Sequence, residues 1–329
     1  MTDSSSRTLL RVPRYDLDVE LEWLSDLAPQ SVATLQSLLP FAGLVARGRR
    51  YAGAVTLRLP HFPLPLIPEN QTGFPVPGDV MLYQLDYGIE LVLNHEGTWR
   101  PYDNRGYIAG NRVGVVANHI SQEVAKTFRR FWFEGAGWGA LGPAGTETVR
   151  SVRDDRQAVE AEIEARYQRW QRANWRDQRR PPAPARARLA KFAIPDYNVE
   201  ANIQLLEEQA PVSVANLWRN LPSQNSMLHG SASGSEMFAH VNEDWGWVPE
   251  LENKMAYPIP GDMVLYFGPP PRIQINYFYG RDSIPAGVPS PEIGNKVGVT
   301  VGDFTDLARA CWRMIYDGQK TLLVDKVPS

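Results

Sequence analysis

The chain has 329 residues, of which 43% are hydrophobic and 22% charged, and its net charge is −3. This length predicts about two domains, and the balance of apolar and charged residues excludes wholesale disorder. The nearly neutral charge gives no overall argument for binding nucleic acid or an anionic membrane.

In chain order, each half of the sequence predicts the same elements. A strictly alternating strand at 16–23 or 198–205 is followed by a short amphipathic helix at 28–40 or 210–222. In the first half a proline-rich extended segment at 61–68 leads to the Pro-Gly-Asp turn, which both halves have. Strands follow at 80–85 and 89–93, or at 263–267 and 272–277. Each half then has an amphipathic helix, which ends near Gly135 or Gly318. In the second half Asp303 could cap this helix. A last strand is predicted at 321–324.

Two distant segments are near copies of each other. Glu69–Tyr83 reads ENQTGFPVPGDVMLY and Glu252–Tyr266 reads ENKMAYPIPGDMVLY, with eight of fifteen positions identical. A second motif recurs as GNRVGV at 110–115 and GNKVGV at 294–299. The chain is therefore an internal duplication. We predict an N-terminal domain at 8–145, a charged helix with a Pro/Arg-rich linker at 146–190, and a C-terminal domain at 191–329.

The segment between the halves differs in composition. Residues 146–174 are charged and predict a helix with a narrow apolar stripe, which we expect to pack on a domain or to form a homo-oligomer through 146–178. Arg179–Arg188 predicts a linker with polyproline character. Its arginines could contact phosphate, but a solvated basic linker is the simpler interpretation, so we expect no nucleic acid partner.

Cysteine content and hydropathy bound the cellular setting. Cys311 is the only cysteine, which excludes an intramolecular disulfide and a thiolate metal cluster and suits a cytoplasmic protein. The polar first residues predict no signal peptide. No run approaches the ~20 apolar residues that a membrane span needs, so we expect no membrane partner.

Strands and turns dominate each half, which predicts a mainly β fold with flanking helices: two small closed barrels joined by a helical linker. The order of HGSASGSE, YPIPGD, YG and GNKVGV resembles a bacterial family with a cyclophilin-like barrel, to which cucumopine synthase is related. The resemblance covers most of 196–326 and, more weakly, 15–135. It implies a tandem cyclophilin-like protein. Cucumopine synthase condenses histidine with 2-oxoglutarate through an imine, without a redox cofactor.

The resemblance also implies candidate catalytic residues. Relatives have a segment similar to H-A-R-W-S-G-E-E, of which the second half keeps His229, Ser233 and Glu236. The first half has instead an arginine and an aromatic residue, Arg50 and Tyr51, as candidate substrate ligands. Either the two halves form a composite site, or one half is structural and the other active. A flexible loop or an anion-binding nest is the alternative interpretation of the Gly230–Glu236 segment.

Further candidates lie in the second half. Tyr257 and Tyr279 belong to a cluster of aromatic residues that suits a planar ligand, with core packing as the alternative. Arg281 follows a YG turn and could grip a carboxylate. The five histidines show no metal-ligand spacing, so we expect no metal and no other cofactor. The Asn and Asp kept in both copies of the duplicated segment are assigned to turn structure.

The first functional hypothesis is a cofactor-independent enzyme acting on a small, carboxylate-bearing, nitrogenous metabolite. The reaction would form an imine or a carbon–carbon bond, or run in the reverse lyase or hydrolase direction. The alternative is a non-catalytic small-molecule-binding or scaffold protein that arose from a duplicated barrel. Peptidyl-prolyl isomerase activity is a third reading with little support, because the catalytic arginine motif of true cyclophilins is not found.

Overall fold

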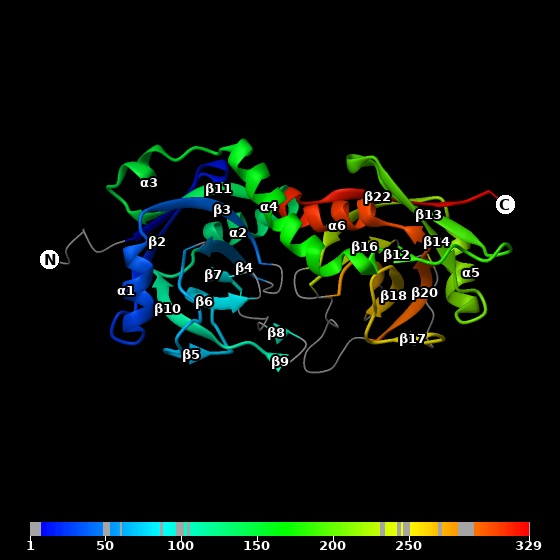
Figure 1. Ribbon diagram of the computed structural model, residues 1–329, viewed down its shortest axis with the longest axis horizontal. Helices are drawn as coiled ribbons and strands as arrows, with labels where there is room; N and C mark the ends of the chain where they lie inside the picture. Colours follow the sequence, from blue (N-terminus) through cyan, green and yellow to red (C-terminus); the bar gives the residue numbers. More distant parts are fainter. Residues whose placement is uncertain are drawn as a thin grey trace. The chain divides into compact units, whose positions relative to one another are not determined.

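The computed structural model describes residues 8–48, 53–59, 61–85, 88–96, 102–103, 106–230, 234–241, 245, 251–268, 272–281 and 293–328. Its contacts divide the chain into two units, Met1–Arg166 with Ile315–Asp317, and Tyr167–Met314 with Gly318–Ser329. Each unit contains one closed antiparallel barrel of eight strands with flanking helices (Figure 1). This confirms the predicted fold class, while the predicted domain boundaries stay predictions.

Barrel 1 closes in the order β2-β1-β11-β3-β4-β7-β6-β10, because β10 pairs back to β2, and β5 extends β10. Its strands are β1 (Thr8–Val12), β2 (Leu17–Trp23), β3 (Phe41–Arg47), β4 (Ala54–Leu59), β5 (Gln71–Thr72), β6 (Asp79–Leu85), β7 (Gly88–Asn94), β10 (Gly110–Val116) and β11 (Gly137–Pro143). A separate pair consists of β8 (Tyr102–Asp103) and β9 (Gly106–Tyr107).

Barrel 2 repeats this order strand for strand as β14-β13-β22-β15-β16-β19-β18-β20, closed by a β14–β20 pairing and extended by β17. Its strands are β13 (Leu189–Ile194), β14 (Val199–Leu205), β15 (Ser223–His229), β16 (Glu236–Val241), β17 (Lys254–Met255), β18 (Asp262–Gly268), β19 (Arg272–Phe278), β20 (Gly294–Thr300) and β22 (Lys320–Lys326). The identical order shows that the duplication covers the whole barrel.

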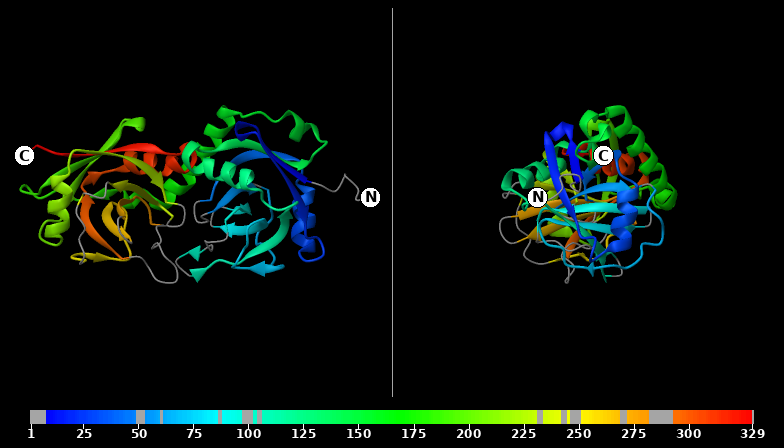
Figure 2. Two further views of the ribbon diagram at one scale, coloured as in Figure 1. Left: turned by 180° about the vertical axis from the view of Figure 1, so that it is seen from behind. Right: turned by 90° about the vertical axis from the view of Figure 1, so that its left-hand side faces the viewer.

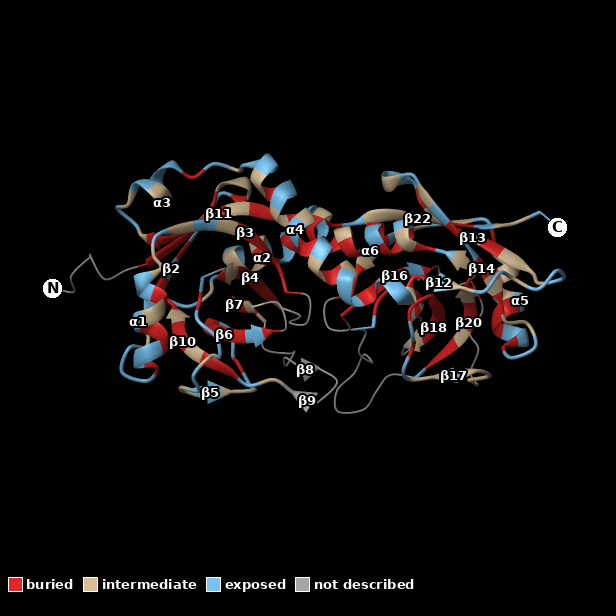
Figure 3. Ribbon diagram, viewed as in Figure 1, coloured by how far each residue is buried: buried red, intermediate tan, exposed pale blue. Residues whose placement is uncertain are grey.

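The helices are α1 (Pro29–Ser37), α2 (Gln122–Glu134), α3 (Glu147–Ser151), α4 (Arg156–Asn174), α5 (Pro211–Arg219) and α6 (Thr305–Asp317). Helices α1 and α5, and likewise α2 and α6, have matching places in the two copies, whereas α3 and α4 occur once, between the copies. Apolar side chains of α1 and α2 join the buried interior of barrel 1, and α1 lies beside β2 and β10 when seen from the front and from behind (Figures 1 and 2). Figure 3 shows the helices buried on one face and exposed on the other.

Three local expectations need correction. The predicted helix at 146–174 is two helices, because residues 152–155 between α3 and α4 are not helical. Arg179–Arg180 are not linker but form β12, which pairs with β21 (Gly302–Asp303). Asp303 lies one residue before the cap of α6, although its Oδ1 still accepts the Thr305 N–H at 2.9 Å.

The apolar stripe predicted for 146–174 is buried within the chain, at Val152, Val159, Ile163, Tyr167 and Trp170. Association of two chains through the other faces of this segment stays a prediction. Among the described residues, no helix combines the length and the apolar character needed to cross a membrane.

The duplicated motifs make a structural network. In the first copy Glu69 accepts backbone N–H bonds from Gln30 and Ser31 at 3.0 and 2.7 Å, and so caps α1 from outside the helix. In the second copy Glu252 does the same for Val212 and Ser213 of α5, at 2.9 and 2.8 Å. The cap residues of these helices, which are alanines, make no side-chain cap bond.

The Pro-Gly-Asp turns are tied to the GN motifs in the same way. Asp79 accepts the Val76 N–H at 2.9 Å and pairs with Arg112 at 2.6 Å. Asp262 accepts the Ile259 N–H at 3.1 Å and pairs with Lys296 at 2.8 Å. The preceding glycines have φ of +97° and +90°, a region open to glycine at little cost. The acids kept in both copies therefore serve the fold, as the sequence predicted.

Removing one of the external caps should destabilise the chain. We expect Glu252→Ala to lower the free energy of unfolding by about 1 kcal/mol, the usual value of a lost helix cap. Thermal or urea denaturation measures this. Glu208→Ala, at an exposed position in the turn before α5, is the matched control and should be neutral. Equal stability of the two variants would show that Glu252 does not cap α5.

The same cap should depend on pH. Burial opposes ionisation of Glu252, but the hydrogen bonds from Ser213 and Val212 outweigh it and lower its pKa below the ordinary 4.5. A carboxylate whose pKa is lowered in the folded state contributes stability above its ordinary pKa and loses it as the pH falls through the lowered value. The difference between wild type and Glu252→Ala should therefore shrink below pH 4.5.

Candidate functional site

Matching backbone bonds equate positions in the two barrels around the HGSASGSE segment. Gly230 N–H donates to Glu236 O at 2.7 Å, just as Gly48 N–H donates to Ala54 O at 2.9 Å. Tyr279 N–H donates to Ser235 O at 3.0 Å, as His95 N–H donates to Gly53 O at 2.7 Å. The residue that occupies each site position in one barrel can therefore be compared with its twin in the other.

Glu236 begins β16 and is paired with an asparagine that the sequence analysis did not single out. The Nδ2 group of Asn276, on the neighbouring strand β19, donates a hydrogen bond to Glu236 Oε1. Both side chains are buried, with 3% and 4% of their surface exposed. Burial of a carboxylate is costly unless hydrogen bonds or a cation compensate. Asn276 provides part of that compensation.

His229, at the end of β15, forms a second pair. Its Nδ1 lies 2.7 Å from Gly230 O and its Nε2 lies 2.5 Å from the hydroxyl of Tyr279. Because a carbonyl oxygen only accepts, Nδ1 carries the proton, and in the neutral ring Nε2 accepts the tyrosine O–H. Both residues are buried. The two predicted site residues His229 and Tyr279 are thus in direct contact.

The two pairs lie on opposite faces of the barrel wall. His229 pairs in register with Met237, whose side chain points away from that of its neighbour Glu236 because side chains alternate along a strand. Tyr277, two residues before Tyr279, meets Phe192 of the non-adjacent strand β13 at 5.0 Å between ring centroids, which identifies this face as the barrel interior. Glu236 and Asn276 therefore lie on the outer face.

The outer face around the pair is apolar at one end and polar at the other. Val264, Tyr266 and Phe278 pack together with Met255 beside it. Along β16 the same face continues from Glu236 to Phe238, which is half-buried, and to His240, which is exposed. His240 and Phe238 meet edge to face at 5.4 Å between ring centroids. The face thus runs from a buried carboxylate to solvent.

Barrel 1 has lost this arrangement. The twins of Glu236 and Asn276 are Ala54 and Val92, which pack in an apolar cluster with Met81, Tyr83 and Leu85. The interior pair is also replaced, since Arg47 stands at the position of His229 and His95 at that of Tyr279. The two barrels therefore differ at the predicted site.

Two predicted binding residues lie near the surface. Arg281 donates from its Nη2 to Asp177 at 2.8 Å, and its backbone N–H donates to Asn174 Oδ1 at 2.9 Å, so the end of α4 holds the YG turn. Tyr257 has 70% of its surface exposed. Their substrate-binding roles stay predictions. Ser233, Arg50 and Tyr51 lie outside the described residues.

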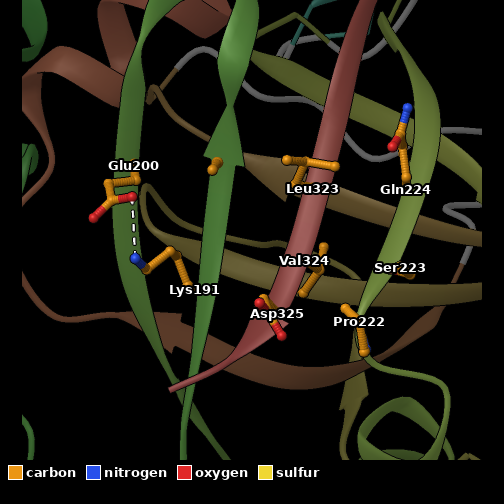
Figure 4. Close-up of a pocket in the computed structure, with 9 residues that line it drawn as sticks. Lys191, Glu200, Pro222, Ser223, Gln224, Leu323, Val324 and Asp325 are labelled. Carbon is orange, nitrogen blue, oxygen red and sulfur yellow. Dashed lines mark ion pairs between the residues drawn. The ribbon is translucent and has the colours of Figure 1, made fainter. Parts of the chain in front are cut away.

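A separate groove of about 380 Å³ lies on another part of barrel 2, across β13, β14, β15 and β22 (Figure 4). An ion pair between Lys191 and Glu200, at 3.2 Å, borders it. In barrel 1 the corresponding wall is covered by α3, whose Val149 packs with Leu9 and Ala140. None of the predicted site residues that the structure describes is among those that line this groove.

No group of three or more His, Cys, Asp or Glu side chains is placed to hold a metal ion in the described part of the chain. The residue that the sequence analysis missed is Asn276. A signal was present, since the strand RIQINYF alternates apolar residues with Gln274 and Asn276. Polar residues at alternate positions predict an outward face, but only the strand order brings that face to Glu236.

His95, which occupies the position of Tyr279 in barrel 1, should make the stability of the chain depend on pH. His95 lies 5.3 Å from the Phe128 ring, between centroids, and burial lowers its pKa to about 4. Since the unfolded chain binds this proton near pH 6.5 and the folded chain does not, stability should fall from pH 6.5 to pH 4, by at most about 1.4 kcal/mol per pH unit.

Urea denaturation across that range tests the effect. His95→Asn should give a flatter curve than wild type, while His119→Asn, at an exposed left-handed position that asparagine tolerates, should follow wild type. Parallel curves for all three proteins would contradict a buried neutral His95.

Comparison with known proteins identifies the family. No curated protein matches the chain. Among solved structures, the hypothetical protein AF2241 from Archaeoglobus fulgidus shares 23% identity with a TM-score of 0.31, over 43% of this chain and 95% of that one. McbB in complex with tryptophan shares 15% identity with a TM-score of 0.34, over 50% of this chain and 55% of that one. The family described as "Protein of unknown function (DUF3830)" matches twice, at residues 10–141 and 192–324, and this chain belongs to that family as a tandem duplication.

Proposed function

We propose that barrel 2 is the active half of a cofactor-independent enzyme acting on a small, carboxylate-bearing, nitrogenous metabolite. The observation that carries this proposal is the buried pair of Glu236 and Asn276 on the outer face of β16 and β19. Barrel 1 builds the same wall with Ala54 and Val92. The fold therefore does not need a carboxylate at this position, which favours a functional reason for it.

Glu236 is assigned the proton transfers. Imine formation from an amine and a ketone requires a proton to reach the departing hydroxyl and another to leave the nitrogen. A single carboxyl group can carry out both steps in turn, and it also serves the reverse direction. The resemblance of the HGSASGSE segment to that of relatives of cucumopine synthase supports an imine or carbon–carbon bond-forming reaction, or its lyase or hydrolase reverse.

His229 and Tyr279 are assigned a positioning role. Both side chains lie on the inner face of the barrel, where His229 ends β15 and Tyr279 follows β19. The hydrogen bond between them connects the ends of these two strands. Ser233 remains a candidate catalytic residue. Arg50 and Tyr51 belong to the composite-site alternative and stay predictions from the sequence. Arg281 would bind the substrate carboxylate by exchanging its present partner Asp177 for the ligand.

Barrel 1 is proposed to be structural. Its residues at the site positions are apolar, apart from Arg47 and His95. Arg58 of β4 pairs with Glu162 of α4 at 3.8 Å, and Glu162 accepts a hydrogen bond from Arg166 of the same helix at 2.8 Å. The alternative function is a non-catalytic protein whose two barrels bind a small molecule or act as a scaffold. The experiment below distinguishes this alternative from an enzyme.

The test is a thermal-shift screen of amino acids, 2-oxo acids and cyclic amides, followed by mass spectrometry for turnover. A ligand that binds only the folded state raises the apparent melting temperature. We expect turnover by wild type and a loss of at least about 100-fold in Glu236→Gln, the lower range for removing a general acid–base group.

The matched control is Glu200→Gln, which changes an exposed glutamate on another wall of the same barrel. It should keep wild-type turnover. Stabilisation by a metabolite without turnover would support the binding protein instead. Equal turnover by Glu236→Gln and wild type would remove Glu236 from the mechanism.

A further inference from the structure

We infer that the Glu236–Asn276 pair recognises an N–H-bearing group of the substrate, an amine, amidine or ring N–H, and that the substrate carboxylate binds elsewhere. This inference rests on the proposed function, since it names which end of the nitrogenous metabolite faces the buried pair. It follows from the one hydrogen-bond acceptor that Asn276 leaves open.

The open position is the amide oxygen of Asn276. Its Nδ2 group is used in the bond to Glu236 Oε1. Its Oδ1 is buried and has no hydrogen-bond partner in the described part of the chain. Buried polar atoms in proteins are nearly always paired, and an unpaired one in a native structure calls for an explanation. A ligand N–H placed against Oδ1 supplies the missing donor.

The charge at the pair selects the same kind of ligand. The carboxylate of Glu236 and the carbonyl of Asn276 are both acceptors, so a second carboxylate placed against Oδ1 would meet an acceptor and a like charge. A group with N–H donors, and above all a cationic one, can donate to Oδ1 and is attracted by the neighbouring carboxylate. The aromatic rings of Phe278 and Tyr266 on the same face suit a cationic or planar group.

The duplicated barrel argues against a structural role for the open acceptor. Ala54 and Val92 hold the same two positions in barrel 1 and pack within an apolar cluster. Exchange of both partners of a buried polar pair for apolar residues can be nearly neutral for stability. The double variant Glu236→Ala/Asn276→Val copies the residues of barrel 1, so we expect it to fold.

The experiment uses two isosteric probes on the full-length chain. Acetamidine presents two N–H donors and a positive charge, whereas acetate presents two acceptors and a negative charge. Dissociation constants are measured by titration for wild type, for the double variant and for the Asn276→Val single variant. Asn202→Val, at an exposed position on β14, is the matched control.

We expect acetamidine to bind wild type and Asn202→Val alike, and to bind the double variant at least about tenfold more weakly, which corresponds to the loss of one charged hydrogen bond. Asn276→Val should fall between them. Acetate should bind no more tightly to wild type than to the double variant. Tighter binding of acetate to wild type, or acetamidine binding that is equal in all proteins or absent, would overturn the inference.

These outcomes are separate from those for the proposed function. If a metabolite is turned over but acetamidine shows no dependence on the pair, the enzyme stands and the recognition of an N–H group fails. If acetamidine depends on the pair and no metabolite is turned over, the recognition stands and the chain is a binding protein.

Discussion

The ion pair between the acid of each Pro-Gly-Asp turn and the base of each GN motif is the constraint on which both barrels depend. Asp79 with Arg112, and Asp262 with Lys296, join strands β6 and β10, or β18 and β20, at the point where the chain enters the wall. Around each pair, Asn111 or Asn295 binds a serine of the short helix, at 2.9 Å in both copies. The network fixes helix, turn and wall together, and it explains why these motifs are the best-preserved parts of the duplication.

Because this network stabilises both barrels, other positions can carry different residues in the two copies. Once the turn acids and the external helix caps hold the wall, the outer face of β16, β19 and β18 can differ between copies without loss of the barrel. Barrel 1 has Ala54 and Val92 at two positions of that face, beside polar side chains such as Thr56 and Glu90, whereas barrel 2 carries Glu236 and Asn276 at those two positions. Side chains on the outer face of a closed sheet make no contribution to its hydrogen-bonded ladder, so exchanges at these positions affect local packing and polarity more than topology.

Much of the fold was predictable because periodicity and turn chemistry act locally. The strand that ends at Trp23, the helices that begin at Pro29 and Pro211, and the end of α2 at Gly135 all follow from such signals. The strands β3, β4, β15 and β16 were not predicted, and they lie where the two copies diverge most; β1, β10, β11, β13 and β20 were also not predicted. The site was predictable only in part. His229 and Glu236 are seven residues apart in sequence, but which faces they occupy depends on strand ends and register, and these are set by long-range pairing rather than by local pattern.

The polar groups of barrel 2 divide into two kinds according to whether the chain itself satisfies them. The hydroxyl of Tyr277 meets Thr300 Oγ1 at 3.0 Å, and that hydroxyl donates in turn to Gly261 O, so this interior cluster closes on itself. His229 likewise bonds to Gly230 O and Tyr279. Asn276 instead donates to Glu236 and leaves its oxygen without a donor. A closed network restrains one conformation, whereas an acceptor left open beside a carboxylate gains free energy only when another molecule supplies the N–H. This contrast supports the proposal that the outer face of barrel 2 carries the function and that the interior pairs stabilise the barrel wall.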